Sequence, residues 1–217
     1  MDNSHGAQHP RLQHHFYSMD QQLEASTLGM WVFLVTEVMF FGGLFMAYLV
    51  YRTSFFHDFE EGSRALNVTM GAINTVVLIC SSLTMALAVR ASQLGKKGAL
   101  LVNLALTMVF GSTFLVVKYF EYAEKFRLGH VPGPNFHGTP GEQIFFSLYF
   151  CLTGLHAIHM IVGLGLMAFI FVNSAKGKYT PEWYTPVEIS GLYWHFVDIV
   201  WIFLFPLLYL IGGRYTI

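Results

Sequence analysis

Five apolar segments, each long enough to cross a membrane, constrain this chain more than any other feature. A spanning helix needs about 20 mostly apolar residues. The segments that meet this length cover about residues 27–52, 67–91, 98–122, 142–173 and 187–211. The strands of outer-membrane barrels are segments of roughly ten residues in which apolar and polar side chains alternate. The five segments do not show this alternation. The sequence therefore predicts an all-α fold, a polytopic membrane helix bundle with five transmembrane helices.

The polar stretches divide the chain into three regions. Residues 1–25 form a polar N-terminal tail without the apolar core of a secretory signal, residues 26–213 form the transmembrane domain, and residues 214–217 form a short C-terminal tail. The sequence GKKG at 95–98 predicts a tight turn. We therefore expect the second and third spanning helices to be antiparallel neighbours.

Composition supports the membrane assignment and excludes nucleic-acid binding. Charged residues make up 12% of the chain, well below the roughly 25% of soluble domains. The net charge of -1 leaves no basic stripe that could neutralise phosphates. Cys80 and Cys151 lie in apolar stretches, where we expect buried thiols rather than a disulfide.

The basic residues give only a weak preference for one orientation. Lys and Arg divide equally between the two predicted sides of the membrane. The short loop 90–97 is dense in base and free of acid, which is typical of cytoplasmic loops. This pattern predicts a cytoplasmic N-terminus and a periplasmic C-terminus.

One carboxyl group, Glu37, stands in the middle of the first segment, LGMWVFLVTEVMFFGGLFM. A charged side chain at the bilayer centre costs roughly 2.5–3.5 kcal/mol on insertion scales. Glu37 is therefore either a neutral acid that hydrogen-bonds a neighbouring helix, or a proton-exchanging or lipid-related group.

Two histidines, His156 and His159, are three residues apart in TGLHAIHMIVG and precede Gly163 on one helix face. Two ligands on one helix do not complete a zinc, copper or haem site, so no metal is predicted. We expect the imidazoles to hydrogen-bond an acid, a backbone carbonyl or a lipid head group, with Gly163 allowing close helix approach. Our hypothesis is that Glu37 is protonated and hydrogen-bonded to His156 or His159.

The last segment carries a polar face made of Glu188, Gly191, His195 and Asp198. Two acids around a histidine are less costly to bury as a hydrogen-bonded set than singly. The face is either a structural network that docks this helix or a proton relay. Trp194 and Trp201, one step aside, are expected to pack or to anchor at the membrane interface.

Lys118, Glu121 and Lys125 in KYFEYAEKF have the spacing of ion pairs along one helix. Such pairs contribute about 0.2–0.5 kcal/mol each. We expect this helix to emerge into the membrane interface there. The chain contains no GxxxxGK[ST], HExxH or GxSxG motif, and no catalytic residue is predicted.

Four stretches together resemble one known family. STLGMWVFLVTEVMFFGGLFMAY, FEYAEKF, LTGLHAIHMIVG and YWHFVDIVWIFLFPLLYLIG are similar, in this order, to subunit III of the haem-copper terminal oxidases, in particular cytochrome c oxidase. The resemblance covers about residues 26–213. It fits the short five-helix bacterial form, which lacks the first two helices of mitochondrial members.

The resemblance implies a non-catalytic core subunit of a proton-pumping oxidase that reduces O2 to water in aerobic respiration, in a bacterial inner membrane. Haem and copper would lie in partner subunits, with direct contact to subunit I and indirect contact to cytochrome c through subunit II. This chain would hold phospholipid in a cleft and support proton uptake. The family motif positions are matched by Glu37, His156, His159, Glu188, Trp194, His195, Asp198 and Trp201.

Two alternatives remain open at this stage. The chain could be the same subunit of a quinol oxidase or of a nitric-oxide-reductase-associated homologue, because the donor site lies in another chain. It could instead be an independent proton-coupled carrier that uses Glu37 and the histidines. Carriers usually have broken helices and internal repeats, and neither is evident in the sequence.

Overall fold

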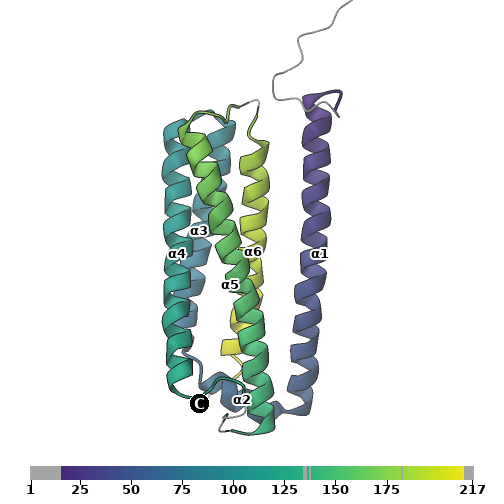
Figure 1. Ribbon diagram of the computed structural model, residues 1–217, viewed down its shortest axis with the longest axis vertical. Coiled ribbons are helices and arrows are strands. Elements are labelled where there is room, and N and C mark those ends of the chain that lie inside the picture. Colours follow the sequence, from purple (N-terminus) through teal and green to yellow (C-terminus); the bar gives the residue numbers. More distant parts are fainter. Residues whose placement is uncertain (1–15, 134–135, 137, 182, 213–217) are drawn as a thin grey trace, which may run out of the picture.

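The described part of the chain folds into six helices, of which five are long and apolar enough to cross a membrane (Figure 1). The structure is a computed structural model that describes residues 16–133, 136, 138–181 and 183–212. The helices are α1 (Met19–Ser54), α2 (Phe56–Arg64), α3 (Val68–Gln93), α4 (Lys97–Arg127), α5 (Pro140–Ala175) and α6 (Thr185–Tyr209). The predicted all-α fold with five transmembrane helices is confirmed.

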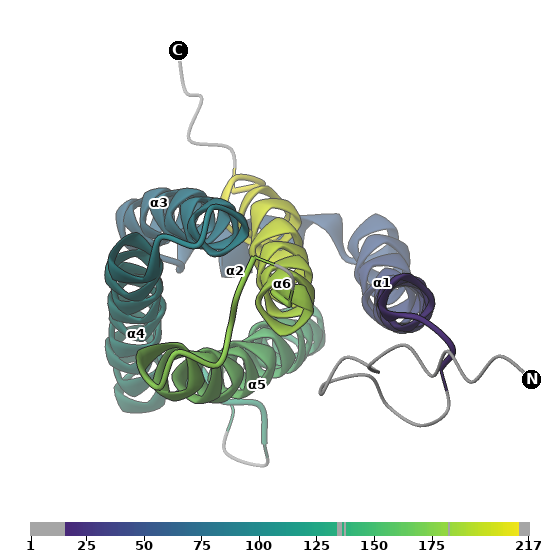
Figure 2. The same cartoon turned by 90° about the horizontal axis from the view of Figure 1, so that it is seen from above.

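Four of the spanning helices, α3 to α6, form a closed bundle, and α1 stands outside it (Figure 2). α3 and α4 are antiparallel neighbours, joined by a turn in which Gly95 has a φ of 66°. That left-handed conformation suits glycine, which confirms the turn predicted from GKKG. α1 contacts the bundle through rings such as Phe41, whose centroid lies 6.2 Å from that of Phe196 on α6.

Capping residues set helix ends that differ from the expected spans. α1 begins at Met19 rather than near residue 27, because the Ser18 side chain accepts a hydrogen bond from the Gln21 backbone N–H. α1 thus includes part of the stretch that we expected to be a polar tail, whereas residues 1–15 and 213–217 lie outside the described residues. α5 begins with a capping box between Thr139 and Glu142.

The short helix α2 was not predicted, and it closes one end of the bundle. The Ser63 hydroxyl donates to the Leu208 carbonyl (2.8 Å) and accepts from the Gly212 backbone N–H (3.1 Å). On the same helix the Phe59 ring is fully buried. α2 therefore ties the end of α6 to the rest of the protein and satisfies backbone groups that a helix end leaves open.

Two glycines let α6 pack deeply between its neighbours. Trp194 of α6 lies against Gly111 of α4 and Gly163 of α5, and a Cβ added at either glycine would come within 3 Å of the indole ring. The predicted role of Gly163 in close helix approach is confirmed. Trp194 is fully buried, and its indole N–H donates to the Ser81 hydroxyl of α3 (2.9 Å). This side chain therefore joins all four helices of the bundle.

Candidate functional site

Glu37 of α1 meets His159 of α5 at the junction between α1 and the bundle. The Glu37 Oε2 and His159 Nε2 atoms are 3.2 Å apart, and the two side chains are 19% and 17% exposed. The other ring nitrogen, Nδ1, lies 2.8 Å from the Leu155 carbonyl oxygen. His159 is therefore the only one of the two predicted histidines that is hydrogen-bonded to the acid.

These contacts fix how many protons the Glu37–His159 pair holds. A backbone carbonyl can only accept a hydrogen bond, so His159 Nδ1 carries a proton. A neutral ring then accepts at Nε2 and needs a protonated Glu37 as donor, whereas a doubly protonated ring donates to a Glu37 carboxylate. In both states the pair holds the same number of protons and has no net charge. This neutrality removes most of the cost of placing an acid at this depth.

A groove beside the pair opens between α1, α5 and α6. Its volume is about 470 Å³, and apolar side chains such as Met30, Phe33 and Val162 line most of it. Glu37, His159 and Tyr193 supply polar atoms, and the Tyr193 hydroxyl donates to the His159 carbonyl (3.1 Å). We call this feature the α1–α5–α6 groove. Its mostly apolar walls suit an acyl chain.

His156 does not reach Glu37. It is fully buried, with ring centroids 5.3 Å from those of Phe114 and Trp201. Neither ring nitrogen has a hydrogen-bond partner among the described residues. Residues three apart on a helix differ by about 60° in direction, which turns His156 into the four-helix bundle and His159 toward α1.

The polar residues of α6 do not form the mutual hydrogen-bonded set that we expected. His195 Nδ1 lies 2.8 Å from the Ser82 hydroxyl of α3. Asp198 is 3% exposed and interacts with the Ser82 hydroxyl, but its carboxylate oxygens make no well-formed hydrogen bond among the described residues. Glu188 is partly exposed in the first turn of α6. The face thus docks on α3, with His195 as its hydrogen-bonding contact.

The two tryptophans pack inside the protein and are not at the membrane interface. Trp194 and Trp201 are both fully buried, and Trp201 donates its indole N–H to the Thr75 hydroxyl of α3 (3.1 Å). Hydroxyl groups on α3 thus give both indoles a partner, so no polar membrane surface is needed to satisfy them.

Of the two ion pairs expected on this helix, the pair between Lys118 and Glu121 is present, in a buried cluster around Glu121. Lys118 is 4% exposed and Glu121 is fully buried, with Lys118 Nζ 3.0 Å from Glu121 Oε2. The hydroxyl groups of Tyr149 and Tyr209 donate to Glu121 Oε1. Lys125 is also buried. Its ammonium group donates to the Ala65 carbonyl, just after α2, and not to Glu121. These three charged side chains are therefore buried inside the protein, and among the described residues Glu121 forms an ion pair with Lys118 alone.

Metal-binding groups do not gather in the described part of the chain. No three or more histidine, cysteine, aspartate or glutamate side chains there are arranged to hold a metal ion. Cys80 and Cys151 are free, as expected, but both are exposed on the outer surface of the bundle rather than buried.

Comparisons with known proteins point to one family. The family model described as cytochrome c oxidase subunit III matches residues 12–213. Cytochrome c oxidase subunit 3 of Corynebacterium diphtheriae is 35% identical over 188 residues, 85% of this chain and 87% of the relative. Cytochrome bo(3) ubiquinol oxidase subunit 3 of Pseudomonas putida is 33% identical over 87% of each chain. Cytochrome c oxidase subunit 3 of a Synechocystis strain is 34% identical, over 84% of this chain and 74% of the relative.

Proposed function

Because the chain belongs to the cytochrome c oxidase subunit III family, and so to a haem-copper oxidase complex, we propose that it is a non-catalytic core subunit of that complex. In this proposal it packs against subunit I in a bacterial inner membrane. Electrons reach haem and copper in subunits I and II, and the complex reduces O2 to water. Cytochrome c reaches the complex through subunit II, and this chain stabilises subunit I and supports its proton uptake.

The observation that carries a more specific role is the hydrogen-bonded Glu37–His159 pair at the α1–α5–α6 groove. A groove of about 470 Å³ with apolar walls accepts part of a phospholipid acyl chain. A net-neutral pair can face lipid without the cost of a bare charge. We therefore assign structural phospholipid binding to this groove.

The variant Glu37→Gln is expected to leave assembly and haem content unchanged. The glutamine amide N–H can donate to His159 Nε2 in the same way as a protonated carboxyl group. Glu37→Leu has a similar size but no donor, and it should lower the stability of the complex by about 1–3 kcal/mol because His159 Nε2 is left unpaired. Thermal denaturation of the two purified complexes, together with their haem-to-protein ratios, measures both effects.

Loss of haem or of subunit I from the Glu37→Gln complex would contradict the prediction that a neutral donor at position 37 is enough for assembly. Equal stability of the Glu37→Gln and Glu37→Leu complexes would show that the pair makes no hydrogen bond that matters for the fold.

A quinol donor is the second candidate. The Pseudomonas putida relative is named as a ubiquinol oxidase subunit and is about as similar to this chain as the cytochrome c oxidase relatives. Because the donor site would lie in another chain, a dinuclear-copper motif in the partner subunit II would decide for cytochrome c.

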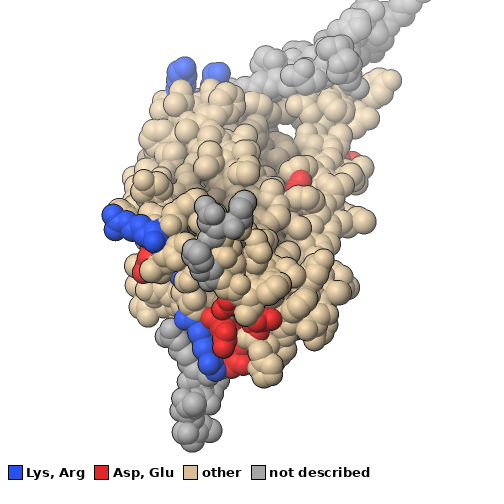
Figure 3. Space-filling model, turned by 60° about the horizontal axis from the view of Figure 1, so that its bottom comes forward, with Lys and Arg blue, Asp and Glu red and all other residues tan. Residues whose placement is uncertain are grey.

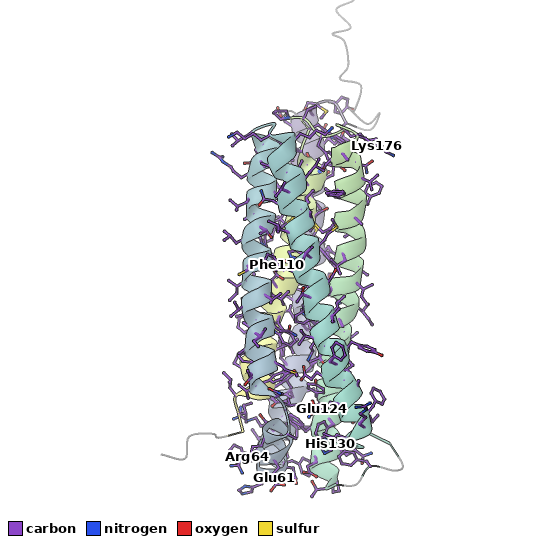
Figure 4. All side chains as sticks on the ribbon, turned by 90° about the vertical axis from the view of Figure 1, so that its left-hand side faces the viewer. Glu61, Arg64, Phe110, Glu124, His130 and Lys176 are labelled. Carbon is purple, nitrogen blue, oxygen red and sulfur yellow. The ribbon has the colours of Figure 1, made fainter. Side chains whose placement is uncertain are left out.

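The basic residues that the structure exposes favour one orientation more clearly than a count of all Lys and Arg residues in the sequence. Lys118 and Lys125 are buried and so do not count as loop charges. Among the described residues, the end opposite α2 carries Arg90, Lys96, Lys97, Lys176 and Lys178, and the α2 end carries Arg52, Arg64 and Arg127. Figure 4 shows Lys176 at one end and Arg64 at the other, and Figure 3 shows acidic side chains gathered at the α2 end. We propose that the Lys176 end is cytoplasmic, with the α2 end in the periplasm.

Thiol labelling tests this orientation. In a background that carries Cys80→Ser and Cys151→Ser, Arg127→Cys should react with a membrane-impermeant maleimide in cells with a permeabilised outer membrane. Lys97→Cys should react only after the inner membrane is broken. The reverse pattern would place the α2 end in the cytoplasm.

A further inference from the structure

A second recess, between α3 and α6, contains polar groups that the Glu37–His159 pair and the α1–α5–α6 groove do not involve. Its volume is about 370 Å³, and Ser82, His195 and Asp198 line it among apolar side chains. Two of those apolar side chains, Leu83 and Ile199, are 62% and 50% exposed. We call this feature the α3–α6 recess.

The hydrogen bonds of the α3–α6 recess are incomplete. His195 Nδ1 and the Ser82 hydroxyl are 2.8 Å apart. Asp198 is 3% exposed and interacts with the Ser82 hydroxyl, but neither carboxylate oxygen makes a well-formed hydrogen bond in the described part of the chain. In a groove on α4, by comparison, the Thr113 hydroxyl donates to the Val109 carbonyl of its own helix (2.9 Å).

The position of the recess makes this incompleteness costly. Ser82 lies near the middle of α3 and His195 near the middle of α6, so both are far from either membrane surface. In the hydrocarbon core an unsatisfied polar group costs several kcal/mol, and polar side chains there face other protein or a water-filled cavity. An acyl chain fills space but offers no hydrogen bond. A transmembrane helix can do both, because a small or polar side chain on it can enter a groove and bond across the interface.

We propose that the α3–α6 recess is where a transmembrane helix of another oxidase subunit docks. The helix that fits it is apolar on both sides of one hydrogen-bonding residue, a hydroxyl, amide or indole side chain at mid-membrane depth. That residue bonds the Ser82–His195–Asp198 group, and its neighbours cover Leu83 and Ile199. This inference rests on the proposed function, since it needs a partner subunit in the same membrane.

Photo-crosslinking in the intact complex tests the docking site. Benzoylphenylalanine is placed at Leu83 in the recess, or at Val109 on α4 as a matched control. The two positions are 62% and 59% exposed, and the hydrogen bond between Thr84 and Thr107 brings their helices together at a similar depth. After irradiation of membranes, the tagged chain is purified and its adducts are identified by mass spectrometry.

The expected result is an adduct between position 83 and a second oxidase subunit, with only lipid adducts at position 109. Phospholipid adducts alone at position 83, or no adduct there, would overturn the docking proposal while the chain still co-purifies with haem. Purification of the chain without haem would instead count against the proposed function.

A packing variant gives an independent measurement. Leu83→Trp overfills the recess, and the yield of haem-containing complex per tagged chain should fall by about tenfold. Val109→Trp should leave that yield unchanged. Equal yields for the two variants would overturn the proposal, and the helix content of the Leu83→Trp chain shows whether it has folded.

Discussion

Replacing Glu121 by Gln should destabilise the protein by about 3–5 kcal/mol, the range found when one partner of a buried ion pair is removed. Glu121 is fully buried and is bonded by Lys118, Tyr149 and Tyr209. Glutamine keeps the size of the side chain but leaves the Lys118 ammonium without a counter-charge. The four residues come from α4, α5 and α6, so the loss should loosen the whole end of the bundle near α2.

The matched control for this variant is Glu124→Gln. Glu124 lies on the same helix and is exposed, so its replacement should change stability by no more than about 0.5 kcal/mol. Thermal denaturation of the purified complex compares the two. A double variant, Lys118→Met with Glu121→Leu, should recover part of the loss because both charges of the buried pair are removed together. Equal stability of Glu121→Gln and Glu124→Gln would contradict the buried pair.

Gly163→Leu should cost at least about 3 kcal/mol and reduce assembly sharply, because the new side chain occupies the place of the Trp194 ring. A Cβ at Gly163 would already lie 2.9 Å from Trp194 Cε3 and 3.3 Å from Tyr193 Cε1. Trp194 also contacts Gly111 of α4 on its other side and donates to Ser81 of α3. The ring therefore has no space into which to retreat.

Gly165→Leu is the control, since a Cβ at Gly165 meets no atom within 4 Å. We expect the Gly165 variant to assemble with normal yield, and size-exclusion chromatography of the two tagged complexes measures the difference. Similar yields for both variants would show that α5 and α6 do not pack as closely as described.

The sequence predicts the spanning helices of this fold because each is a long apolar run, and it predicts the α3–α4 turn because glycine and lysine interrupt that pattern. It does not predict α2, since the segment Phe56–Arg64 is short and mostly polar. α2 is held in place by contact with distant parts of the chain, with α5 through Phe59 and Phe145 and with the end of α6 through Ser63 and Leu208. That contact between residues far apart in the sequence is invisible to a local pattern.

The Glu37–His159 site is predictable in part, because a local sequence pattern marks its residues but not how the helices that carry them pack. An intramembrane acid and histidine are rare enough to mark Glu37 and His159 as partners. The choice between His156 and His159 depends on where α1 stands, which the sequence does not give. The Glu121 cluster is missed because Tyr149 and Tyr209, which satisfy the acid, lie on other helices. The sequence alone does not show that a polar group such as Glu121 is buried, because the partners that satisfy it lie on other helices.

The central claim is that this chain is subunit III of a haem-copper oxidase, and its most direct test is the visible spectrum of the purified complex. The tagged full chain is extracted from its own membrane in mild detergent, and its spectrum and subunit composition are recorded. We expect haem absorption bands and co-purification of two larger oxidase subunits. A colourless chain that purifies alone under the same conditions would contradict the claim and favour an independent membrane carrier.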